Sequence, residues 1–340
     1  MIDGYGRKVD TSAYLNKHKV IRRDLSYFCV SPFAIGTHLG NMDDTDSELY
    51  QASIEYGLSN GINFIDTAIN YRGMRSERDI GSVVSRLIDK RTIKREEIVI
   101  STKAGIIPGD IDAGLVPKDY LEKMLLNPQI IDQSDLNVVD HHRHVLAPSY
   151  YQFAIEQSKK HLGLNTIDIH YIHNPEISLQ VLGADDFYHQ LRQLFLFYEK
   201  QVNIGNIRYY GFATWDGFLS EPDDHRYISL ERVMNVLNEV IGENHHFKFI
   251  QFPYNKTLHF AMTKENQLVK QQYLTLFEAA KKLNLTVVTS APFNLGKLSN
   301  SVADTDSYLL SLVNEESISS IMVGMKHKST VIRNLELIKV

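Results

Sequence analysis

The stretch GINFIDTAINYRGMRSERDIG (residues 61–81) contains a strand, a loop and the start of a helix in close succession. Residues 62–66 form a short, mostly apolar run that ends in Asp66, which is typical of a strand buried on both faces. From Arg75 to residue 90, apolar residues recur at helical spacing. We therefore expect a β-strand at 62–66 and an α-helix at 75–90, joined by a loop.

The same pattern repeats along the chain. We expect eight strands, at 32–36, 62–66, 97–102, 167–172, 207–213, 248–252, 285–290 and 318–323. Helices are expected at about 46–60, 75–90, 149–162, 184–203, 229–242, 268–283, 304–314 and 328–339. Apolar strands that alternate with helices indicate a parallel sheet covered by helices. Eight such units predict an α/β fold of the (β/α)8 (TIM) barrel type.

A doubly wound dinucleotide-binding sheet is disfavoured, because no G-x-G-x-x-G motif follows any expected strand. We expect residues 1–340 to form a single barrel domain with a long insertion, about 106–149, after the third strand. Such connections usually have about 2–6 residues, and long ones often shape substrate sites. The insertion is therefore expected to form much of the pocket, through Asp110, Asp112, Lys118, Tyr120, His141 and Arg143.

Composition excludes several classes of protein. The net charge is −5, with 36 basic and 41 acidic residues spread along the chain, so a nucleic-acid partner is not expected. No apolar run is long enough to span a membrane, and the first residues lack the apolar core of a signal peptide, so a cytoplasmic location is expected. The single cysteine, Cys29, excludes intramolecular disulfides and a cysteine-built metal site. The chain does not indicate an oligomeric state.

Polar residues cluster where three consecutive strands end. Asp66 ends the second strand with Tyr71 behind it, Lys103 ends the third, and His173 ends the fourth. In a (β/α)8 barrel these ends share one rim, where catalytic groups gather. Lys103 would lower the pKa of Tyr71, Asp66 would hold Lys103 charged, and His173 would polarise a carbonyl oxygen. None of these groups can supply a hydride, so a nicotinamide cofactor is implied.

These motifs resemble those of the aldo-keto reductases. The resemblance runs in order through FAIGTHLG (33–40), the stretch 61–81, IVISTKAG (98–105), LNTIDIHYIHNP (164–175), IRYYGFATW (207–215), FIQFPYN (249–255) and IMVGMKHKSTVIRNL (321–335). It implies that Asp66, Tyr71, Lys103 and His173 are the catalytic tetrad. It also implies NADPH bound across the barrel mouth without a dinucleotide-binding domain.

The resemblance further implies a set of cofactor-binding positions. They are Gly36, Thr37, Asp66, Ala213, Thr214, Gln251, Ser290, Pro292, Gly324, Lys326, Thr330, Arg333 and Asn334. Three positions depart from the family pattern: Ala213 replaces a serine, Ser290 a stacking tyrosine, and Arg333 a glutamate. Lys326, His327 and Lys328 cluster where a 2′-phosphate would bind, which favours NADP over NAD.

The substrate is expected to contact His38, Tyr71, His173 and Trp215, although Trp215 could equally shield the cofactor or lie in the core. Arg72 either attracts an acidic substrate or points into solvent. The run from His141 to His144 lacks the spacing of a metal site and is interpreted as an exposed polar loop, so no metal is expected.

The sequence supports reversible, NADPH-dependent reduction of an aldehyde or ketone, with Tyr71 as the general acid and base. The substrate would be a small carbonyl compound, either polar and sugar-like or aromatic. Two alternatives stay open. One is an NADP-binding regulatory module of the same fold with little turnover, and the other is an aldolase that uses Lys103 as a Schiff base.

Overall fold

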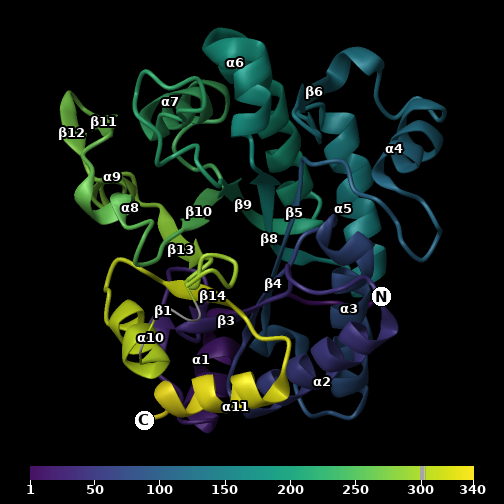
Figure 1. The fold of residues 1–340 in the computed structure, drawn as a ribbon, viewed down its shortest axis with the longest axis vertical. Coiled ribbons are helices and arrows are strands. Elements are labelled where there is room, and N and C mark those ends of the chain that lie inside the picture. The colour runs from purple at the N-terminus through teal and green to yellow at the C-terminus, as the bar shows by residue number, and fades with distance from the viewer. Residues whose placement is uncertain (299–301, 303) are drawn as a thin grey trace.

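The chain forms a closed barrel of eight parallel strands in a computed structural model that describes residues 1–298, 302 and 304–340 (Figure 1). The order around the barrel is β10-β13-β14-β3-β4-β5-β8-β9. The strands are β3 (Phe33–Gly36), β4 (Phe64–Asp66), β5 (Val99–Ala104), β8 (Ile167–His173), β9 (Ile207–Ala213), β10 (Phe247–Pro253), β13 (Thr286–Ser290) and β14 (Ser320–Gly324). All eight expected strands are present, so the predicted (β/α)8 barrel is confirmed.

Helices cover the outside of the barrel. They are α2 (Asp44–Asn60), α3 (Arg75–Asp89), α5 (Pro148–Leu162), α6 (Glu176–Asn203), α7 (Leu230–Val240), α9 (Leu276–Lys282), α10 (Thr305–Val313) and α11 (Lys328–Leu337). Gly163 ends α5 in a left-handed conformation, φ 69°, which glycine adopts without strain. In the described part of the chain, no helix is long and apolar enough to cross a membrane.

Two parts of the expected pattern differ from the structure. The first half of the helix expected at 268–283 is a hairpin of β11 (Gln267–Val269) and β12 (Gln272–Leu274), which leads into α9 and follows the short α8 (Phe260–Thr263). The polar first residues, for which no element was expected, contain α1 (Lys8–Lys17) and the hairpin of β1 (Arg23–Asp24) and β2 (Cys29–Val30).

Along β8 the interior of the barrel changes from apolar to polar. Because side chains of a strand alternate between its faces, Ile169, Tyr171 and His173 of β8 share one face. Ile169 and Tyr171 belong to an inner apolar cluster, separate from the larger core between strands and helices. Phe28, at the β1–β2 hairpin, stacks on Phe249 of that inner cluster with 5.8 Å between ring centroids. The hairpin thus packs against the apolar floor, and the polar residues lie at the opposite end.

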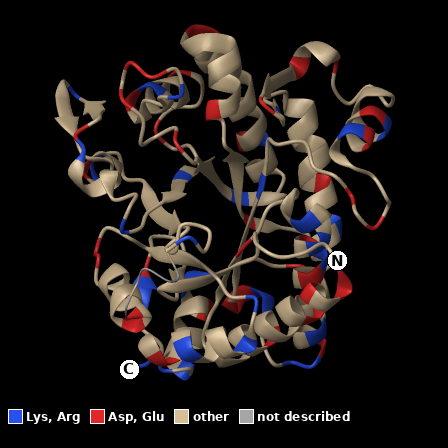
Figure 2. Cartoon of the chain, in the orientation of Figure 1, with Lys and Arg blue, Asp and Glu red and all other residues tan. Residues whose placement is uncertain are grey.

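The insertion after β5 is a folded segment rather than a plain loop. It contains α4 (Pro117–Tyr120), a π-helical turn at Leu121–Leu126, and the antiparallel hairpin of β6 (Leu136–Val139) and β7 (His142–Val145). Asp110 and Asp112 pair with arginines of α3, so these two insertion carboxylates stabilise the scaffold. Elsewhere, basic and acidic residues are interspersed over the helices and loops (Figure 2).

Candidate active site

A hydrogen-bonded cluster lies where β4 and β5 end. Lys103 is fully buried, and its Nζ donates to Asp66 Oδ2 (2.6 Å), to the carbonyl oxygen of Thr67 (2.8 Å) and to the hydroxyl of Tyr71 (3.3 Å). Asp66 Oδ1 accepts from Ser101 Oγ (2.7 Å) and Gln251 Nε2 (3.0 Å). The ammonium therefore bridges a carboxylate and a phenol inside the barrel.

Burial and charge act in opposite directions on this cluster. Burial alone lowers the pKa of Lys103, but the Asp66 carboxylate, helped by Tyr71, raises it above its ordinary value. Desolvation raises the pKa of Tyr71, and the nearby Lys103 ammonium opposes that rise. The pKa of Tyr71 therefore stays above its ordinary value, and the charged Lys103 limits the rise by favouring the ionised form of the phenol.

Two histidines flank the Tyr71 ring. His173, at the end of β8, lies edge-on to it with ring centroids 5.7 Å apart. His38, in the loop after β3, has its ring centroid 4.6 Å from that of Tyr71. Burial, with a further contribution from Lys103, holds the pKa of His173 well below its usual value, so its imidazole is neutral at physiological pH. A neutral imidazole can donate one hydrogen bond to a substrate oxygen.

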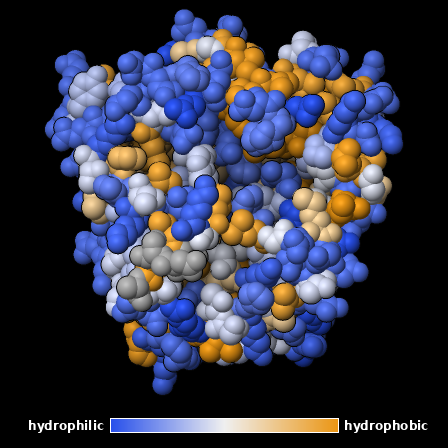
Figure 3. Space-filling model, viewed as in Figure 1, coloured by the Kyte–Doolittle hydropathy of each residue, from blue (hydrophilic) through white to orange (hydrophobic). Residues whose placement is uncertain are grey.

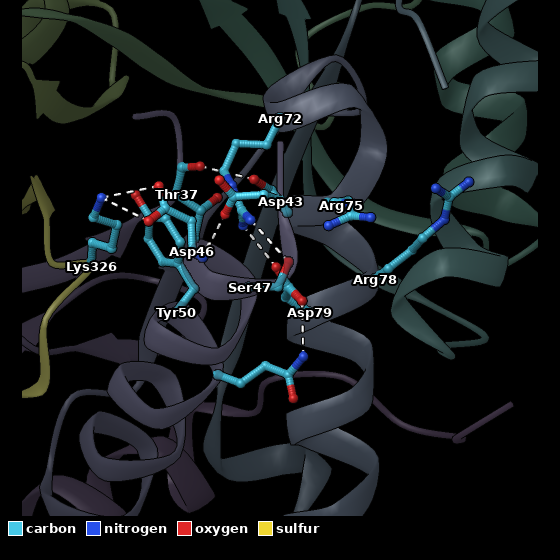
Figure 4. A network of polar contacts seen from close by, with 12 residues as sticks. Thr37, Asp43, Asp46, Ser47, Tyr50, Arg72, Arg75, Arg78, Asp79 and Lys326 are labelled. Atoms are coloured by element: carbon cyan, nitrogen blue, oxygen red, sulfur yellow. Dashed lines mark hydrogen bonds and ion pairs between the residues drawn. The ribbon is translucent and has the colours of Figure 1, made fainter. Parts of the chain in front are cut away.

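A turn held by Arg72 positions Tyr71, and both roles expected for Arg72 from the sequence are wrong. Tyr71 begins the 3-10 turn η1 (Tyr71–Met74), in which Arg72, Gly73 and Met74 all have positive φ. Arg72 is buried and binds Asp79 (2.7 Å) and Ser47 (2.9 Å), as Figure 4 shows. It neither points into solvent nor faces a substrate, and instead its bonds hold this strained turn in place.

A cavity of about 770 Å³ opens above the cluster, and Figure 3 shows a hollow near the middle of this face. Most of the expected site residues line it: Gly36, Thr37, His38, Asp66, Tyr71, His173, Ala213, Thr214, Trp215, Gln251, Ser290, Pro292 and Gly324. Lys103 does not line the cavity, but it is bonded to Tyr71, which does. Residues from eight strand ends and their loops thus converge on one site.

The remaining expected cofactor residues lie beyond this cavity, at β14 and α11, and the cations there are already paired. Lys326 Nζ lies 3.0 Å from both carboxylate oxygens of Asp46 on α2 (Figure 4). Arg333 pairs with Asp306, and Lys328 lies over the Tyr56 ring at 4.9 Å. Asn334 is buried, and Thr330 lies in the first turn of α11.

The sequence did not indicate the outer wall of the cavity. Four of its residues come from the loop after β9 and the start of α6: Glu176, Gln180, Asp216 and Arg226. From the insertion, the lining residues are Ile106, Val139, Asp140 and His142, and none of the six that were expected. The sequence signal that could have indicated these wall residues is a polar residue shortly after a strand end, as Glu176 follows His173.

The family model described as the aldo/keto reductase family matches residues 33–310. A search of curated proteins gives no match.

Several solved structures are similar in fold. The aldo-keto reductase AKR11C1 from Bacillus halodurans, in its holo form, has a TM-score of 0.59 at 16% identity and covers 94% of this chain and 90% of its own. The aldo-keto reductase AKR2E5 of the silkworm Bombyx mori, complexed with NADPH, has a TM-score of 0.60 at 17% identity, over 94% of this chain and 84% of its own. A putative aldo-keto reductase from Pseudomonas aeruginosa has a TM-score of 0.56 at 17% identity, over 93% of both chains.

Proposed function

Because this chain belongs to the aldo-keto reductase family, we propose that it is an oxidoreductase that reversibly reduces an aldehyde or ketone with NADPH. The observation that carries the proposal is the contact from Lys103 to both Asp66 and Tyr71 beneath the cavity. We further propose that residues 1–340 act as one domain and that the enzyme works on small molecules in the cytoplasm.

The residues present fit a nicotinamide cofactor. Thr214 Oγ1 and Asn334 Nδ2 are buried polar atoms without a protein partner among the described residues. Buried polar atoms usually have a partner, and both residues are positions that the family resemblance assigns to the cofactor. NADPH would be held by these two residues and by Gln251, whose Oε1 is not used by its bond to Asp66.

The chain's own groups would carry the proton. The reduced nicotinamide supplies a hydride to the carbonyl carbon when bound. Tyr71 donates its phenolic proton to the carbonyl oxygen, and Lys103 stabilises the phenolate that results. The neutral His173 orients the same oxygen by a hydrogen bond, and Asp66 keeps Lys103 protonated. The reverse reaction uses the phenolate as the base.

The same geometry disfavours the aldolase alternative. A Schiff-base lysine must lose its proton to attack a carbonyl, and such lysines have lowered pKa values. Lys103 instead has a raised pKa and lies 2.6 Å from Asp66. Reduction with borohydride in the presence of a carbonyl compound should leave Lys103 unmodified.

The function is tested with the variant Tyr71→Phe. The wild type should oxidise NADPH with a panel of carbonyl probes such as 4-nitrobenzaldehyde and glyceraldehyde, whereas Tyr71→Phe should lose at least about 100-fold in kcat. Its affinity for NADPH, measured by nicotinamide and Trp215 fluorescence, should stay within about twofold, because Tyr71 does not hold the cofactor. Tight NADPH binding by a wild type that reduces none of the probes would favour the regulatory-module alternative, which the departures Ala213 and Ser290 also favour.

Preference for NADP over NAD would depend on Lys326. We propose that Lys326 exchanges the Asp46 carboxylate for the 2′-phosphate, so that Asp46 competes with the cofactor. Asp46 is itself fixed by a hydrogen bond from the backbone N–H of Asn41 (2.6 Å). Asp46→Asn should therefore tighten NADPH binding about two- to fivefold, equivalent to the ~0.5–1 kcal/mol of a partly exposed ion pair, and leave NADH binding unchanged. Lys326→Met should weaken NADPH alone. Equal effects of either variant on both cofactors would contradict this assignment.

A further inference from the structure

The insertion hairpin is joined to the end of β5. The N–H of Val145 donates to the carbonyl oxygen of Gly105 (3.0 Å), and the N–H of Ile107 donates to that of Arg143 (2.9 Å). The other end of the same hairpin supplies three residues of the cavity wall, Val139, Asp140 and His142. One element of the insertion therefore contacts both a barrel strand and the space above Tyr71.

His144 extends from this hairpin into the barrel rim. It was expected in an exposed loop, but it is fully buried. Residues 142 and 144 lie on the same face of β7, and residue 144, at the end of the strand next to the barrel, is covered while residue 142 is exposed. Its Nε2 lies 2.8 Å from the carbonyl oxygen of His173, and its Nδ1 lies 2.7 Å from Ser178 Oγ. The hairpin thus reaches the backbone of the proposed catalytic histidine.

These two contacts determine the protonation state of His144. A carbonyl oxygen only accepts hydrogen bonds, so Nε2 carries the proton and donates it. In a neutral ring, Nδ1 then accepts a hydrogen bond from the Ser178 hydroxyl. Burial lowers the pKa of His144 to about 4, which agrees with a ring that stays neutral at physiological pH. The imidazole is therefore held as one tautomer by a partner at each nitrogen.

The end of β5 makes room for this hydrogen bond. Gly105 has φ +143°, and a Cβ there would lie 2.5 Å from His144 Nε2 and 2.8 Å from the His173 carbonyl oxygen. A side chain at position 105 would therefore displace one of the two bonded groups. Glycine is the residue that allows β5, β7 and β8 to meet at this point.

The His173 backbone is held on both sides. Beyond the carbonyl bonded to His144, the N–H of Asn174 donates to the carbonyl oxygen of Ala213 on β9 (2.6 Å). By contrast, Nδ1 of the His173 ring is buried and has no protein partner among the described residues. No hydrogen bond at Nδ1 therefore fixes the ring, and its direction depends on the backbone from which it extends and on its packing against Tyr71.

We infer that His144 is a positioning residue through which the insertion orients His173 toward Tyr71. The inference rests on the proposed function. It gives the insertion a role in the chemical step in addition to forming a wall. A substrate that contacts Asp140 or His142 contacts the same hairpin that orients His173.

The test compares His144→Met with His144→Gln, two unbranched side chains of similar size of which only Gln can donate a hydrogen bond to the His173 carbonyl. We measure kcat and KM for 4-nitrobenzaldehyde, the Kd for NADPH, and thermal unfolding. His144→Met should lower kcat about 10- to 100-fold, the loss typical of a slightly misplaced catalytic group, with an unchanged NADPH Kd. His144→Gln should recover most of the activity. His141→Ala, in the exposed turn of the same hairpin, should behave as the wild type.

Other outcomes separate the possibilities. A folded His144→Met with wild-type kcat overturns the inference, as do equal losses of kcat in the Met and Gln variants. If His144→Met does not fold, Ser178→Ala is compared with Ser178→Thr, which keeps the hydroxyl, and equal kcat for the two overturns it. Tyr71→Phe in the same assay tests the proposed function separately. If Tyr71→Phe loses activity while His144→Met keeps the wild-type kcat, the reductase assignment stands and only the inference about His144 fails. A wild type that reduces no probe removes both.

Discussion

The variant Lys103→Met removes the positive charge beneath Tyr71 while leaving most of the volume filled. Lys103 is completely buried, and methionine is a similarly long, unbranched side chain, so no large cavity should form. Asp66 keeps two hydrogen-bond donors, Ser101 Oγ and Gln251 Nε2, and therefore stays in place. The main change is electrostatic.

The size of the effect follows from one distance. Lys103 Nζ lies 3.3 Å from the Tyr71 hydroxyl, and at an effective dielectric constant of about 20 a unit charge at that distance stabilises a phenolate by about 5 kcal/mol. That is about three to four pKa units. The Asp66 carboxylate, no longer neutralised, adds to the rise in the pKa of Tyr71. Because well-placed acid–base catalysis contributes about 10²–10⁴-fold, kcat should fall by about 10³-fold.

Steady-state kinetics in both directions test this result. Oxidation of the alcohol needs the phenolate, so in Lys103→Met the activity that remains should rise only at higher pH than in the wild type and should stay well below the wild-type maximum. The exposed lysine variant Lys90→Met is the control and should match the wild type. A loss below about tenfold, or a shift of the pH profile with full activity at its new optimum, would refute the view that Lys103 enables proton transfer rather than tuning it.

Two predictions concern stability. Burial raises the pKa of Glu176 to about 7, above that of an unfolded glutamate, so the native state binds the extra proton and its stability should decrease as pH rises from about 4.5 to 7. Glu176→Gln should abolish this loss. In urea titrations, the difference in unfolding free energy between the variant and the wild type should grow by about 3 kcal/mol up to pH 8. A difference that does not change with pH would contradict this prediction. Asp168 accepts hydrogen bonds from the N–H groups of Gly6 and Ile100 and pairs with buried Arg95. Asp168→Asn should therefore lower the free energy of unfolding, measured with urea, by about 3–5 kcal/mol. A decrease below about 1 kcal/mol would be inconsistent with this role.

The barrel could be predicted because its strands are short apolar runs in a regular alternation with helices. The proposed tetrad could be placed at one rim for the same reason, since Asp66, Lys103 and His173 each end such a run. The hairpin of β11 and β12 could not be predicted from its turn. Lys270 and Gln271 both have positive φ there, a conformation normally indicated by Asn-Gly, so its apolar residues were interpreted as one face of a helix.

Long-range pairing explains the other differences. Lys326 and Asp46 are 280 residues apart, and their ion pair depends on how α2 and α11 pack against each other. The burial of His144 depends on the register of a hairpin and on the space that Gly105 leaves. α1 buries only Thr11, Tyr14 and Leu15, so its sequence lacks a strong apolar stripe.

The apolar floor of the barrel has a consequence for the movement of protons. Phe28 and Phe249 close the inner cluster below Lys103, so water reaches Tyr71 from the side of the cavity. If Tyr71 gives its proton to a product, as proposed, it must regain one before the next cycle from the cavity side, where the exposed His38 lies 4.6 Å from its ring. A product bound in the cavity would therefore lie between Tyr71 and the solvent that returns its proton.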